Sequence, residues 1–126
     1  MAPTLVRAIG NGPEGVIYVA AGNPQITVPS VLVSEYSAGA VSTYEVDPNG
    51  DPIVATRRVL LSGLSGAEGA LIDPVTGDFL FSTFGGGNQL VRVSGFVAPP
   101  EPVPLPATLP LLLGGLGLLL ARRRRG

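Results

Sequence analysis

The side chains that could do chemistry in this chain are almost all carboxylates, because it contains no histidine, cysteine or lysine. That absence removes the usual general base, the thiol nucleophile and the commonest zinc ligands. A serine nucleophile would have no histidine partner, which excludes a Ser-His-Asp hydrolase. We therefore predict that the chain is not an enzyme and that it holds no metal and no cofactor.

Two acidic segments could in principle bind a cation. Asp47–Asp51 (DPNGD) is rich in oxygen ligands, but it lacks the spacing and the terminal glutamate of an EF-hand loop. Turn chemistry accounts for its residues, and the same holds for Asp73–Asp78. Gly85–Asn88 (GGGN) lacks the Gly-Lys-Ser/Thr ending of a phosphate-binding loop, so we predict a hairpin turn there.

The remaining charged residues give no clear site. Glu35 and Glu45 fall in neighbouring predicted strands, but a catalytic carboxylate pair needs a separation that the sequence does not specify. Arg57 and Arg58 are predicted to be an ordinary charge pair on an edge strand.

Short apolar runs rich in β-branched and aromatic residues alternate with Gly, Asn, Asp and Pro turns. Short runs of this kind, separated by such turns, predict an antiparallel all-β fold. The predicted strands are Gly15–Ala21, Val31–Tyr36, Ala40–Val46, Ile53–Leu61, Gly69–Asp73, Phe79–Phe84 and Gln89–Phe96.

The strand pattern repeats once. Gly12–Gly15 (GPEG) matches Gly66–Gly69 (GAEG), and Ser30–Ser34 matches Asp78–Ser82, an offset of about fifty residues. The pattern resembles the blades of NHL-like or SMP-30-like β-propellers, which implies about two four-stranded blades. In SMP-30-like propellers, acids at the starts of inner strands ligate a divalent metal. Glu14 and Glu68 recur at such positions, but a recurrent turn position explains them more simply.

The C-terminal segment is apolar and ends in a basic cluster. Leu109–Ala121 has no charged or polar side chain, and Arg122–Arg125 follow it directly. As a helix, Leu105–Ala121 would be about 25 Å long, and snorkelling arginines would extend its reach across a bilayer core of about 30 Å. We predict a transmembrane helix over residues 107–121 and a basic cytoplasmic tail over residues 122–126.

A proline-rich spacer precedes this helix. Residues 97–106 read VAPPEPVPLP. The chain therefore ends in a short Pro motif, an apolar predicted helix and an Arg cluster, in that order. This tail resembles the PEP-CTERM sorting signals of Gram-negative bacteria, in the variant with a VPLPA motif. The resemblance covers about a fifth of the chain and implies recognition and cleavage by exosortase, a membrane-bound cysteine transpeptidase. It assigns the sorting motif to Val103, Pro104, Leu105, Pro106 and Ala107, and the stop-transfer signal to Arg122, Arg123, Arg124 and Arg125.

The resemblance also implies a location. The chain would sit transiently in the inner membrane as a single-pass protein with a cytoplasmic C-terminus, and would then reach the cell surface or the extracellular space. The implied partners are exosortase, the lipid bilayer and, as a further candidate, extracellular polysaccharide. Nucleic acid is not expected, because the chain outside Arg122–Arg125 is acidic.

These predictions divide the chain at residue 96. Residues 1–96 would be the propeller-like body, residues 97–106 the linker with the sorting motif, and the rest the membrane segment. The opening MAPTLVRAIG lacks the features of a secretory signal, and two blades cannot close a propeller. We therefore expect a C-terminal fragment of a longer exported propeller; a small sandwich or twisted sheet is the alternative.

The sequence favours a structural or adhesive role for this surface protein. Two other functions stay open: a fragment of a propeller enzyme such as an SMP-30-like lactonase, and a C-terminally anchored membrane protein that is never cleaved.

Overall fold

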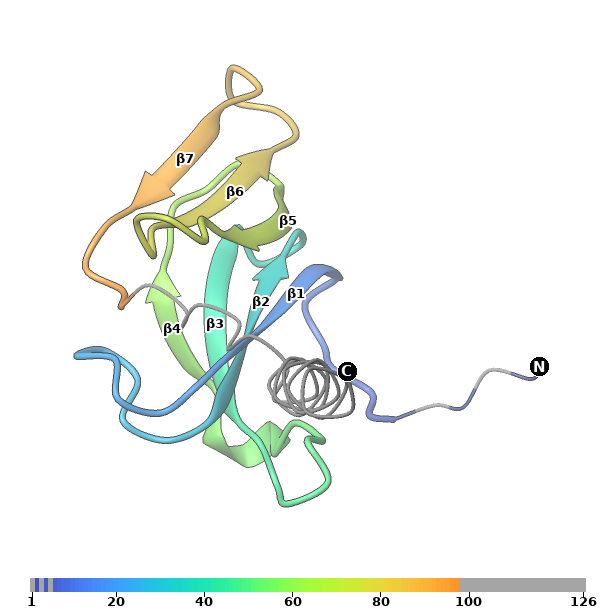
Figure 1. Cartoon of the computed structure of the whole chain (residues 1–126). Helices are drawn as coiled ribbons and strands as arrows, with labels where there is room; N and C mark the ends of the chain where they lie inside the picture. The colour runs from blue at the N-terminus through green and yellow to red at the C-terminus, as the bar shows by residue number, and fades with distance from the viewer. Residues whose placement is uncertain (1, 3, 5, 98–126) are drawn as a thin grey trace, which may run out of the picture.

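The computed structural model describes residues 2, 4 and 6–97, which form two antiparallel β-sheets (Figure 1). The prediction of an antiparallel all-β fold is confirmed. One sheet has four strands in the order β1-β2-β3-β4, and the other has three in the order β5-β6-β7. The strands are β1 (Pro13–Val19), β2 (Ser30–Glu35), β3 (Ala40–Glu45), β4 (Arg58–Leu61), β5 (Ala67–Ile72), β6 (Phe79–Thr83) and β7 (Leu90–Val93).

Helical structure in this part of the chain is limited to one 3-10 turn, η1 (Val54–Thr56). Within the described ranges, no helix has the length and apolar character needed to cross a membrane. The predicted transmembrane helix and basic tail lie outside the described residues.

The predicted strand over Ile53–Leu61 was wrong in its first half, which forms η1, while its second half forms β4. The reason is a side chain that competes with strand pairing. Thr56 Oγ1 donates a hydrogen bond to the Ile53 carbonyl at 2.7 Å and accepts one from the Glu45 N–H at 2.9 Å. A hydroxyl that binds nearby main-chain groups in this way favours a turn over an extended strand.

The predicted turns are confirmed. The Asp47 carboxylate accepts hydrogen bonds from the N–H groups of Asn49 and Asp51, and the Asp73 carboxylate accepts one from the Val75 N–H. Gly50 and Gly77 have φ angles of 88° and 76°, a region that glycine enters without steric strain.

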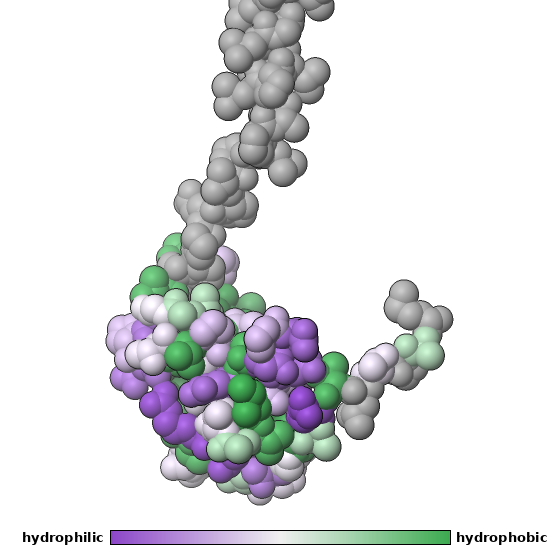
Figure 2. Space-filling view, turned by 90° about the horizontal axis from the view of Figure 1, so that it is seen from below, coloured by the Kyte–Doolittle hydropathy of each residue, from purple (hydrophilic) through white to green (hydrophobic). Residues whose placement is uncertain are grey.

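The main hydrophobic core lies between the two sheets. Leu32 and Val41 from the first sheet pack in one cluster with Phe79 and Phe81 from the second. The rings of Phe79 and Phe81 are stacked with centroids 5.5 Å apart, and Phe96 lies 6.1 Å from Phe79. By contrast, the end of the molecule that carries η1 is largely hydrophilic, with small apolar patches (Figure 2).

Each sheet contains the same arrangement of three strands. We call β1–β3 the first unit and β5–β7 the second unit. The Tyr36 N–H donates to the Gly12 carbonyl at 2.7 Å, and the Phe84 N–H donates to the Gly66 carbonyl at 2.8 Å. In both units the strand pairing is antiparallel and the chain order is the same. The sequence repeat therefore corresponds to a repeat in structure.

The units meet closely where their first strands approach each other. A Cβ atom on Gly15 would lie 2.5 Å from the Gly69 carbonyl carbon, so only glycine fits there. The Ser34 hydroxyl donates to the Gly69 carbonyl at 2.6 Å. A matched glycine pair and one buried hydroxyl thus fix the packing of β5 against β1 and β2.

Candidate functional site

The most unusual chemical feature of the body is a buried carboxylate. Glu35 lies at the end of β2 and is 0% exposed. Because strand side chains alternate, Glu35 shares a sheet face with Val31 and Val33, and this face is the one turned away from the second sheet. Together with Ser42, Tyr44 and Arg57 it forms what we call the Glu35 cluster.

Every other member of this cluster donates to the carboxylate. Ser42 Oγ lies 2.9 Å from Oε2, and the Tyr44 hydroxyl lies 2.5 Å from Oε1. Arg57 binds in a forked geometry, with Nε 3.0 Å from Oε1 and a terminal nitrogen 2.6 Å from Oε2. Such bidentate, charge-assisted hydrogen bonds are among the strongest in proteins.

The contacts set the ionisation of the cluster. Burial opposes the charge on Glu35, but the hydrogen bonds from Arg57, Tyr44 and Ser42 outweigh it and lower the pKa of the carboxyl to about 2. Burial and the adjacent Glu35 carboxylate raise the pKa of Tyr44 to about 12. The hydrogen bonds to Glu35 also raise the pKa of Arg57. At neutral pH the cluster therefore holds one carboxylate, one guanidinium and one neutral phenol.

These properties suit structure better than catalysis. A carboxylate with a pKa of about 2 and both oxygens bonded is a weak general base. The cluster ties β2, β3 and the segment after η1 together, and we assign it the role of a structural clamp.

The clamp predicts an acid-sensitive contribution to stability. The pKa of Glu35 is lower in the folded protein than the ordinary 4.5, so its contribution is complete above about pH 4.5 and is lost as the pH falls toward 2. We expect wild type to lose about 3 kcal/mol more than Glu35→Gln across this range. Urea denaturation at several pH values measures the difference, and parallel pH profiles for the two proteins would contradict the prediction.

An open apolar groove of about 350 Å³ lies on the same sheet face. Val16 and Tyr18 on β1 line it and are 58% and 59% exposed. Val6 and Ile9 also line the groove, so the segment before β1 forms one of its walls, and Pro13 lines it from the start of β1. The Tyr18 hydroxyl donates to the Gly50 carbonyl at 2.9 Å, which holds the ring at the groove's edge.

A second, more polar groove of about 260 Å³ lies at the end of the sheet near η1. Its lining includes Thr43, Glu45 and Arg58, and the Arg58 guanidinium donates to the Gln25 carbonyl. Of the charged side chains that line this groove, Arg58 is therefore already hydrogen-bonded within the protein.

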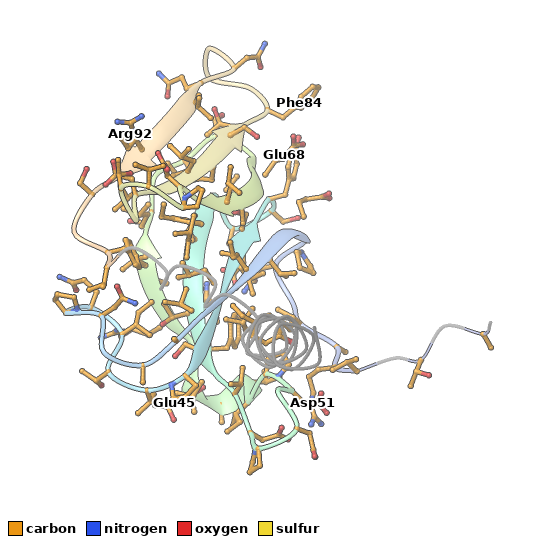
Figure 3. All side chains as sticks on the ribbon, in the orientation of Figure 1. Glu45, Asp51, Glu68, Phe84 and Arg92 are labelled. Atoms are coloured by element: carbon orange, nitrogen blue, oxygen red, sulfur yellow. The ribbon has the colours of Figure 1, made fainter. Side chains whose placement is uncertain are left out.

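The carboxylates singled out in the sequence do not converge. Glu45 and Asp51 lie at one end of the body, and Glu68 lies at the other (Figure 3). Glu35 pairs with Ala40 and Glu45 with Ser30, so the two glutamates lie at opposite ends of the antiparallel β2–β3 pair. Residues 2, 4 and 6–97 contain no cluster of three acidic side chains that could hold a metal ion. Glu14 and Glu68 occupy equivalent positions in β1 and β5.

Two loop predictions have different outcomes. Gly85–Asn88 is a hairpin turn between β6 and β7, closed by a hydrogen bond from the Asn88 N–H to the Gly85 carbonyl at 3.1 Å. The prediction that Arg57 and Arg58 are an ordinary charge pair on an edge strand was wrong for Arg57, which binds the buried Glu35. The sequence signal that could have revealed this contact is Glu35 itself, which shares the alternation of the apolar residues Val31 and Val33 on β2.

The sorting-motif residues 103–107 and the stop-transfer residues 122–125 lie outside the described residues. Comparison of the chain with protein-family models, with curated protein sequences and with solved structures found no match.

Proposed function

We propose that this chain is an exported surface protein with a C-terminal PEP-CTERM sorting signal of the VPLPA variant, which exosortase processes. The observation that carries the proposal is the order of three features at the chain's end. The motif Val103–Ala107 comes first, the apolar run Leu109–Ala121 follows, and Arg122–Arg125 come last. In physical terms the first suits an extended recognition peptide, the second a membrane span and the third a topology anchor.

The end of the body supports this division of the chain. Phe96 packs into the core between the sheets, and the Val97 N–H donates to the Asn23 side-chain oxygen. The proline-rich sequence begins directly after these anchoring contacts. Prolines disfavour helix in the residues before them and stiffen the peptide, which suits a motif that a membrane protease must bind in extended form.

The body supports a structural or adhesive role. We propose that its two units are propeller-derived blades. Supporting this are the antiparallel order of the strands, the offset of about fifty residues and the packing of one unit on the other. The Glu35 cluster connects β2, β3 and the segment after η1 in a body that would act outside the cell, and extracellular polysaccharide is a candidate partner there.

The test is the mass of the mature protein in bacteria with and without exosortase. We expect loss of the residues that follow the cleavage point only where exosortase is present. The double variant Pro104→Ala/Pro106→Ala should stay uncut, because its motif is no longer held extended. The control Pro99→Ala, which alters the same spacer outside the motif, should be processed like wild type. An intact tail in both strains would contradict the proposal and support an uncleaved membrane anchor.

A further inference from the structure

The outer face of the second unit is open and carries exposed apolar side chains beside the charged residues Glu68 and Arg92. Leu71, Phe84 and Leu90 are 55%, 65% and 75% exposed. Leu71 pairs with Leu80 across the sheet, which places the two leucines on the same face. We call this surface the second-unit outer face; Phe84 lies beside it at the end of the molecule that also carries Glu68 (Figure 3).

The same positions in the first unit are covered. Leu80 corresponds to Leu32 and Leu90 to Val41, because the register is equivalent: Leu32 pairs with Thr43 as Leu80 pairs with Arg92, and Val41 pairs with Ser34 as Leu90 pairs with Ser82. Leu32 and Val41 are fully buried against the second unit. The residues of the first unit that hold the two units together therefore have apolar counterparts on the outer face of the second unit.

An aromatic contact repeats the pattern. The ring of Tyr36 lies against Gly66, where an added Cβ atom would come within 2.7 Å of its edge. Phe84 follows β6 as Tyr36 follows β2, and both make the same main-chain hydrogen bond to a glycine of their own unit. By this correspondence, the surface that Phe84 fits is the surface around Gly12, the counterpart of Gly66.

That surface is also open. Val16 and Tyr18 on β1 correspond to Ala70 and Ile72 on β5, which pack in the core between the units. In the first unit this part of the sheet forms the apolar groove, whose wall includes Pro13 next to Gly12. The rest of the face is already covered, because Ile9 and Val46 pack on the buried Val31 and Val33, and the Glu35 cluster lies beyond them. The β1 side is therefore the part available for packing.

We propose that a second copy of this chain packs its groove, beside β1, onto the second-unit outer face. The contact would use the β1 part of the sheet face that corresponds to the packing between the two units, with Phe84 seated near Gly12 and Pro13. Val31 and Val33, the counterparts of Phe79 and Phe81, are already buried and would stay outside it. The two surfaces differ, so the interface is heterologous and copies join head to tail. This inference does not depend on the proposed sorting function.

Chemical cross-linking tests the geometry, since the chain has no cysteine of its own. Full-length Leu90→Cys and Val16→Cys proteins, kept in a mild detergent, would be treated with a short bismaleimide. We expect a cross-linked dimer when the two variants are mixed and little when either is treated alone. Val75→Cys, whose side chain is exposed in the β5–β6 turn, replaces Leu90→Cys as the control and should not cross-link to Val16→Cys.

A second measurement separates this interface from association through the apolar C-terminal segment. The double variant Phe84→Ser/Leu90→Ser keeps that segment and should weaken association by about tenfold or more in sedimentation velocity. Its circular dichroism should match wild type, because both side chains are exposed. Unchanged association in this variant would overturn the proposal, as would a wild type that is monomeric throughout. Efficient cross-linking of Leu90→Cys alone would also overturn it, by indicating symmetric pairing of two second-unit faces.

Discussion

Replacement of Arg57 by alanine is expected to lower the free energy of unfolding by about 3–5 kcal/mol, because it leaves the Glu35 carboxylate buried without its counter-ion. Ser42 and Tyr44 would still donate hydrogen bonds. Neither carries a positive charge, so burial would then raise the pKa of Glu35 relative to the wild-type protein. Because the gap to the ordinary value of 4.5 is then smaller, the variant should lose less stability than wild type as the pH falls toward 2.

Urea denaturation followed by circular dichroism measures this effect. Arg58→Ala is the matched control, since it removes the neighbouring guanidinium, which donates a hydrogen bond to the main-chain carbonyl of Gln25. We expect a loss below about 1 kcal/mol for Arg58→Ala, as for other exposed polar contacts. Equal losses for the two variants would show that Arg57 does not hold the buried charge.

Gly15→Ala is expected to destabilise the protein by about 3 kcal/mol, because overpacking forces backbone shifts in a tight contact. The new Cβ atom would lie 2.5–2.7 Å from the Gly69 main chain, where no flexible side chain can move aside. The first strands of the two units would have to separate. The Ser34–Gly69 hydrogen bond would lengthen as a result.

Gly10→Ala is the control for this substitution, since an added Cβ atom there meets nothing within 4 Å. It should leave the midpoint of thermal unfolding close to that of wild type. A Gly15→Ala protein as stable as Gly10→Ala would contradict the close approach of β1 and β5.

The strands and turns could be predicted from the sequence because their signals are local. Gly39, Gly50 and Gly77 lie in turns with positive φ angles, and the apolar runs between such turns became strands. The segment Ile53–Arg57 differed because the Thr56 hydroxyl binds main-chain groups of Ile53 and Glu45, a contact that strand propensity does not register.

The Glu35 cluster could be predicted only in part. The glutamate is in phase with Val31 and Val33, and Ser42 and Tyr44 alternate in the same way on the next strand, which hinted at a polar patch within an apolar face. Its cation comes from Arg57, which lies beyond a turn and a 3-10 helix. Whether Arg57 reaches Glu35 depends on how that connection folds, and no local sequence pattern specifies this contact.

The anchoring of Phe96 and Val97 has a mechanical consequence. A pull on the C-terminal end would reach the body first at the Phe96 ring, which sits between the sheets, and at the Val97 hydrogen bond to Asn23. Both sheets would then share the load. The edge strand β7 would therefore not be separated from β6 one hydrogen bond at a time. A body tethered by its tail would resist tension through its hydrophobic core.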